Sequence, residues 1–120
     1  MKPEKGLEKE LEQLTGAYCE AAPKDTPYPY AVFSVRRSTE TDERQAYILE
    51  INVWDQHQYY SRAESVMDEL ENKLHRCNHL TDRYLIRIFR GPRQNVPDPD
   101  KDIKRVREQF EMYVYEREDE

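Results

Sequence analysis

The residues best suited to hold a metal ion are two histidines and an aspartate in the second half of the chain. His75 and His79 are four residues apart, and Asp82 follows three residues later, a spacing at which imidazole and carboxylate groups could face one ion. The alternative is an ordinary polar helix end, where a histidine in the last turn is favoured by the helix dipole. We favour this alternative because metal-binding histidines are expected on more rigidly held elements. A metal-dependent enzyme using these three residues is therefore the last of the functions considered.

The other reactive side chains lack the neighbours that catalysis requires. A nucleophile needs a base and an orienting group, and neither Cys19 nor Cys77 has them in its sequence context, so both are expected in the core. Two cysteines without metal-site spacing favour a reduced, cytosolic setting. Carboxylate pairs such as Glu69 with Glu71 are expected on a solvated face. The sequence therefore predicts no enzyme, no catalytic residue and no cofactor.

Basic residues concentrate in the last third of the chain, whereas the predicted central helix is rich in acidic ones. In the simplest interpretation, opposite charges lie across the last hairpin, where each pair contributes roughly 0.2 to 1 kcal/mol. In the functional interpretation they join neighbouring subunits, and their complementarity sets register and partner choice more than affinity. The residues of this hypothetical subunit or partner interface are Arg87, Arg90, Arg93, Arg105, Arg107, Glu64, Asp68 and Glu71.

The composition predicts one folded domain, residues 1–120, with a lean core. Charged residues make up 37% of the chain, but nine tyrosines and one tryptophan add large side chains that can bury apolar surface. The net charge of −6 gives no reason to expect tight binding to a phosphate backbone. Aromatic residues among the basic ones could still stack on single-stranded nucleic acid, an interpretation that the acidity makes weaker. We expect neither a signal peptide nor a membrane span, since no apolar run approaches the ~20 residues that a span needs.

The central stretch, residues 46–77, predicts a strand and the helix that covers it. Residues 46–56 alternate between an apolar face and a mixed face, the period of a strand. Residues 59–77 repeat apolar side chains at three- and four-residue steps, which places them in one stripe on a helix. That stripe is most simply buried against the dry face of the strand, which predicts a two-layer α+β core.

The remaining pattern predicts the order α-β-β-α-β-β, a mainly antiparallel sheet covered on one face by two helices. The last strand has a helix as its alternative, and we favour the strand because Tyr-Val-Tyr is β-prone. The other predicted segments are a helix at 1–16, an extended connector at 21–29, strands at 30–37, 84–90 and 106–116, a charged loop at 38–44, a connection at 78–83, a loop without secondary structure at 92–102 and a solvated tail at 117–120.

Together with this order of elements, two local sequences suggest a family. The stretch PYPYAVFSV enters the first strand, and INVWDQHQYYSRAESVMDEL joins the second strand to the helix. The chain resembles the tail-terminator, or tail-completion, proteins of long-tailed phages and related prophages, in which a V-W pair precedes a polar turn and a helix that opens with an aromatic and a small residue. The matching positions are Val53, Trp54, Tyr59 and Ala63. The proline-rich sequence PRQNVPDPD departs from that pattern, which has a shorter crossing.

The resemblance implies a structural virion protein without catalytic activity. Similar proteins form a hexameric ring that caps the tail tube, stops its growth and offers the surface that joins the head connector. The implied partners are other copies of the chain, the major tail tube protein and the head-connector protein, with DNA only passing through and no membrane. The implied location is the cytoplasm of the bacterial host during assembly, and then the virion tail. A small adaptor or regulatory domain that binds proteins through an open sheet edge is the alternative.

Overall fold

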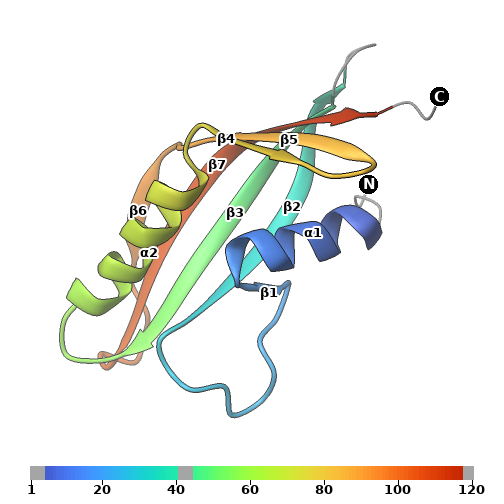
Figure 1. Cartoon of the computed structure of the whole chain (residues 1–120). Helices are drawn as coiled ribbons and strands as arrows, with labels where there is room; N and C mark the ends of the chain where they lie inside the picture. The colour runs from blue at the N-terminus through green and yellow to red at the C-terminus, as the bar shows by residue number, and fades with distance from the viewer. Residues whose placement is uncertain (1–4, 41–44, 118–120) are drawn as a thin grey trace.

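The computed structural model describes residues 5–40 and 45–117, so predicted segments within 1–4, 41–44 and 118–120 lie outside the described residues. The described chain is an α+β structure in which strands predominate (Figure 1). Its elements are α1 (Lys5–Thr15), β1 (Tyr18–Cys19), β2 (Tyr30–Glu40), β3 (Gln45–Gln56), α2 (Ser61–Leu74), β4 (Cys77–Leu80), β5 (Tyr84–Phe89), β6 (Arg93–Val96) and β7 (Ile103–Glu116).

The sheet is built around the long strand β7. The strand order is β1-β2-β3-β7-β5-β4, and β6 also pairs with β7. On one side, β7 pairs with β3 from Gln45↔Val114 to Gln56↔Ile103. On the other side it pairs first with β6 and then with β5. The short β1 runs parallel to β2 and the remaining pairs are antiparallel, so the sheet is mixed.

The core forms where the helices meet the strands. In β3 the side chains of Tyr47, Leu49, Ile51 and Val53 are buried and alternate with partly exposed ones, as the period-two pattern predicts. Both helices lie in front of the strands (Figure 1). Their apolar stripes join the same buried cluster, α1 through Leu7 and Leu11 and α2 through Ala63, Met67, Leu70 and Leu74. The predicted strand and helix within residues 46–77 are thus both present.

Several predicted boundaries are wrong, and each error has a physical reason. The central helix ends at Leu74, because His75 is extended and Arg76 has a φ of 63°, which no helix accommodates. Residues 77–80, predicted as helix end and connection, instead form β4 against β5. The segment 92–102 was expected to lack secondary structure. Its proline-free part, Arg93–Val96, pairs with the stretch of β7 that β5 does not reach.

The predicted order α-β-β-α-β-β therefore describes only the six longer elements. It omits β1, β4 and β6, which contain two to four residues each and are too short to show a period. The last element is a strand, as favoured, but begins at Ile103 rather than at residue 106. The first helix spans Lys5–Thr15 among the described residues, and β2 extends to Glu40, into the segment predicted as a loop.

Candidate functional site

Arg93, the first residue of β6, contacts three carboxylates from two other elements. Its Nε donates to Oε1 of Glu108 on β7 at 2.8 Å. Its Nη1 lies 2.7 Å from Oδ1 of Asp68, and its Nη2 lies 2.6 Å from Oε2 of Glu71, both on α2. We call these four residues the Arg93 cluster. Because it joins β6, β7 and α2, the cluster fastens β6 to both the sheet and the helix.

Glu108 is the unusual member of the cluster, because its side chain is fully buried. Burial raises the pKa of Glu108 to about 7, and the neighbouring Glu71 adds to the rise while Arg93 opposes it. For Glu71, partial burial acts to raise the pKa, but hydrogen bonds with Glu108 and Arg93 hold it below its ordinary value. Among the described residues, no donor faces Oε2 of Glu108. We infer that below about pH 7 the Glu108 carboxyl is protonated and donates to Glu71.

Part of the charged interface that was predicted between subunits instead forms contacts within a single chain. Arg90 also reaches Glu71, with 3.5 Å between Nη1 and Oε1. Arg90, Arg93, Asp68 and Glu71 therefore already form ion pairs within one protomer. The prediction that Glu71 lies on a solvated face together with Glu69 is wrong, because Glu71 is half-buried in the cluster.

The other predicted interface residues lie apart from the cluster. Arg105 donates from Nε to Oδ1 of Asn52 at 2.8 Å, and its guanidinium lies over the Trp54 ring, 4.8 Å from the ring centre. Arg107 lies against the side-chain amide of Gln94. The remaining two contacts are Arg87 over the ring of Phe89 and Glu64 with Asn95.

The turn that carried the family resemblance is held by an ion pair between a buried carboxylate and a half-exposed arginine. Asp55 is fully buried, and Arg62 in the first turn of α2 donates to both of its carboxylate oxygens, at 3.0 Å from Nε and 2.5 Å from Nη2. Such a bidentate pair fixes direction as well as distance. It therefore sets the angle at which α2 leaves β3, while Val53 and Ala63 pack into the core on either side.

The three candidate metal ligands each have a different environment. The Nδ1 of His75 accepts a hydrogen bond from the backbone N–H of Arg90, 2.9 Å away. The backbone N–H of His75 donates to the carbonyl oxygen of Glu71 in α2. His79, on β4, lies 3.2 Å from the carboxylate of Glu10, and Asp82 is exposed. Within residues 5–40 and 45–117, no three histidine, cysteine or acidic side chains form a metal-binding group. The structure therefore does not bring the predicted ligands together.

Both cysteines are half-buried free thiols that pack against the core, as expected. Burial, together with nearby glutamates, raises the pKa of Cys19 to about 11. Burial also raises the pKa of Cys77. Since the thiolate is the nucleophilic form, neither thiol is activated.

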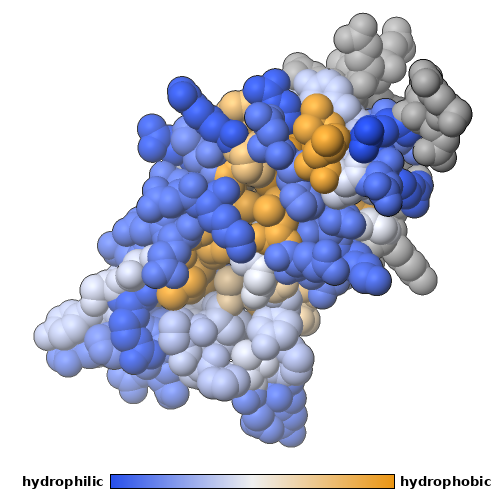
Figure 2. All heavy atoms as spheres, in the orientation of Figure 1, coloured by the Kyte–Doolittle hydropathy of each residue, from blue (hydrophilic) through white to orange (hydrophobic). Residues whose placement is uncertain are grey.

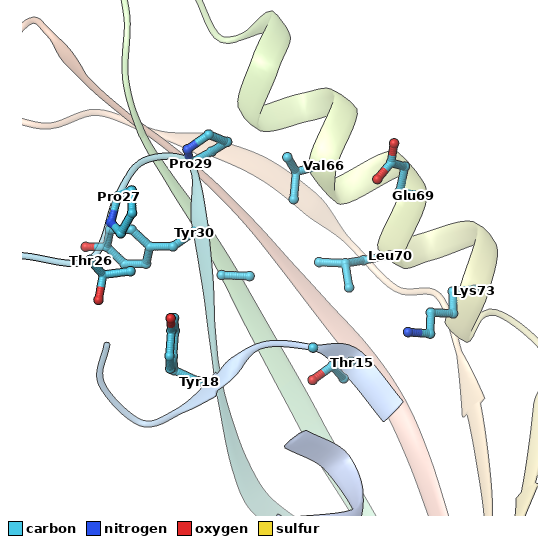
Figure 3. Close-up of a pocket in the computed structure, with 12 residues that line it drawn as sticks. Thr15, Tyr18, Thr26, Pro27, Pro29, Tyr30, Val66, Glu69, Leu70 and Lys73 are labelled. Atoms are coloured by element: carbon cyan, nitrogen blue, oxygen red, sulfur yellow. The ribbon is translucent and has the colours of Figure 1, made fainter. Parts of the chain in front are cut away.

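A groove of about 430 Å³ opens between the end of α1, the connector before β2 and the exposed side of α2 (Figure 3). Figure 2 shows that apolar surface is exposed in the region between the two helices. Prolines, tyrosines and aliphatic side chains form much of the lining, with Glu69 and Lys73 as its charged members. The full lining is Thr15, Gly16, Tyr18, Thr26, Pro27, Pro29, Tyr30, Ala31, Val66, Glu69, Leu70 and Lys73.

Comparison with known proteins shows a solved structure with the same fold and a family to which the chain belongs. A chain in a structure described as the virion of a native gene transfer agent (GTA) particle has the same fold, with a TM-score of 0.68 over 88% of this chain and 84% of that chain at 15% sequence identity. None of the curated protein sequences compared with the chain matches it.

The chain belongs to the tail completion protein gp17 family, whose sequence profile matches residues 8–115. The resemblance drawn from the residues around Val53 and Trp54 is thus confirmed. The protein is a structural component of a phage tail. No helix within the described part of the chain is long and apolar enough to cross a membrane.

Sequence reasoning missed Glu108, the fully buried member of the Arg93 cluster, although a signal was present. Glu108 occupies an inward position between Val106 and Phe110 in an otherwise apolar alternation. A carboxylate at such a position must be paired or protonated, because burying an isolated charge is costly. Its partner Arg93 lies 15 residues away, and no local spacing would have suggested that pair.

Proposed function

We propose that this protein completes a phage tail by forming a ring on the end of the tail tube. The ring is a hexamer that stops growth of the tube and presents the surface to which the head connector attaches. Residues 1–120 act as a single, non-catalytic domain without a cofactor. Assembly takes place in the cytoplasm of the bacterial host, from a phage or prophage gene. Membership of the tail completion family supports this role.

The observation that carries the proposal is that the described sheet has two different outer edges, and that strands at each edge have an outer side without a partner strand. On one side, β1 covers β2 only at Val32 and Phe33, and no described strand pairs with the outer side of β2 beyond them. On the other side, β4 and β6 are the outermost strands. Two different edges facing opposite directions favour head-to-tail contacts, which close into a ring when the rotation between copies allows it.

Charged side chains supply the specificity of this contact. Arg87, Arg105, Arg107 and Glu64 remain candidates for the subunit or partner interface. Arg90, Arg93, Asp68 and Glu71 act indirectly in this proposal, because their contacts with one another hold β6 in place at the outer edge. The net charge of −6 suits a ring through which DNA passes without sticking.

Light scattering coupled to size-exclusion chromatography, over a series of salt and protein concentrations, tests the ring. We expect a species of six subunits in solution or, if the ring forms only on its template, capped ends in negative-stain images of tail tubes mixed with the protein. A monomer under every condition that also leaves tube ends bare would refute the proposal.

The same open edge of β2 supports one alternative, an adaptor that receives a strand from another protein. The two functions differ in stoichiometry, because an adaptor would bind its partner as a monomer and would ignore tail tubes. The mixing experiment therefore separates them.

A further inference from the structure

We propose that residues 97–101 of one copy dock into the groove between α1 and α2 of the next copy. This loop, which follows β6, has the sequence Pro-Asp-Pro-Asp-Lys. The inference rests on the proposed self-assembly and identifies the contact that joins adjacent subunits.

The loop follows the edge strand β6, whereas the groove lies beside β2, toward the opposite edge but at the same end of the sheet. Tyr30 of β2 lies opposite Trp54, Trp54 lies opposite Arg105, and Arg105 lies opposite Val96 of β6. One row across the sheet therefore begins at Tyr30, which lines the groove, and ends at Val96, which precedes the loop. A second copy placed beside the first at the same level brings the loop of one to the groove of the other.

The lining of the groove suits a proline-containing loop. Pro27, Pro29, Tyr18 and Tyr30 present rings, and Leu70 adds an aliphatic side chain from α2 (Figure 3). Such rings can pack against the exposed rings of Pro97 and Pro99, and a proline loses little conformational freedom on docking because its φ is already fixed.

The loop is already ordered in the free protein and exposes its prolines. The carboxylate of Asp98 accepts the backbone N–H of Asp100 at 2.9 Å, and that of Asp100 accepts the N–H of Asp102 at 2.9 Å. Pro97 and Pro99 are exposed. Because these turns hold the loop in one shape, docking costs less ordering than it would for a flexible segment.

The charges of the two surfaces are complementary. The groove carries Lys73 and Glu69, and the loop carries Asp98 and Asp100 followed by Lys101. Acidic groups of the loop can therefore face Lys73 while Lys101 faces Glu69. Such pairs at a rim set orientation and association rate more than affinity.

Disulfide trapping tests the contact in the full chain. The test variant combines Pro99→Cys in the loop with Pro27→Cys in the groove, both at exposed positions. The control variant combines Pro99→Cys with Asn78→Cys, which is exposed on β4 at the same lateral edge as the loop. We expect at least about tenfold more linked product from the test pair, because docking raises the effective concentration of the two thiols. The test pair should give a ladder of linked oligomers, and a mixture of the two proteins that each carry one introduced cysteine should give only linked dimers. The wild type, which has only the half-buried native thiols of Cys19 and Cys77, gives the background linkage.

Failure of the contact and failure of the proposed function give different results. Rings or capped tubes in which the test pair links no more than the control pair would overturn the docking and leave the tail-completion role standing. A protein that is monomeric under every condition, ignores tail tubes and shows no linkage would overturn both.

Discussion

Replacing Glu108 with glutamine should remove a pH-dependent loss of stability. Glutamine has nearly the same shape as the protonated acid, so it can accept from Arg93 and donate to Glu71 as we infer Glu108 does. The native pKa of about 7 lies above the ordinary value of 4.5. The folded state therefore holds this proton more tightly than the unfolded state, and stability falls as the pH rises between these two values.

The magnitude follows from the two pKa values. A rise from 4.5 to about 7 corresponds to roughly 3 kcal/mol, at about 1.4 kcal/mol per tenfold change in proton affinity. Glu71, whose pKa is lowered, has the opposite effect, which is lost only as the pH falls below its ordinary range. The two effects therefore occupy different pH windows. Relative to the wild type, Glu108→Gln should be nearly unchanged at pH about 4.5 and more stable by up to about 3 kcal/mol at pH about 8.

Denaturant unfolding measured across this pH range provides the assay. The matched control is Glu111→Gln, an exposed position on the same strand, which should leave the pH dependence of the wild type in place. Parallel pH profiles for the wild type and Glu108→Gln would refute the inference that Glu108 is protonated in the native state below about pH 7.

Two further substitutions test how β6 is held in place. Arg93→Ala should lower the free energy of unfolding by roughly 3 kcal/mol in denaturant titration, because it leaves the buried Glu108 and also Asp68 without their cation, and Glu71 with Arg90 alone; a loss below about 0.5 kcal/mol would show that the contacts of Arg93 contribute no more than solvated surface pairs. Gly91→Ala should cost about 1 to 3 kcal/mol in thermal or denaturant unfolding, since its Cβ would overlap a backbone carbonyl of β7. Its control is Gly6→Ala in α1, where the nearest atom is 3.6 Å away and alanine should stabilise the helix by about 0.5 to 1 kcal/mol. Equal effects at the two glycines would contradict the steric argument.

The sequence by itself determined the long elements and the family. The period-two alternation from Tyr47 to Val53 and the helical stripe from Ala63 to Leu74 each record which face of one element is buried. These patterns are local, so a single sequence shows them directly. The residues around Val53 and Trp54 likewise lie within one turn between β3 and α2, and they were enough to suggest the tail completion family.

Only the tertiary structure decided the short strands, the Arg93 cluster and the groove. The short strands β1, β4 and β6 have no period of their own and exist because a longer strand offers a free edge. The sequence indicated that Arg93 is basic, but its three carboxylates come from positions 15 to 25 residues away and meet it only when α2 packs against the sheet. The groove similarly requires α1, the connector and α2 to lie on one side of β2. Contacts of this kind depend on how elements pack across the chain, and local periodicity carries no information about that choice.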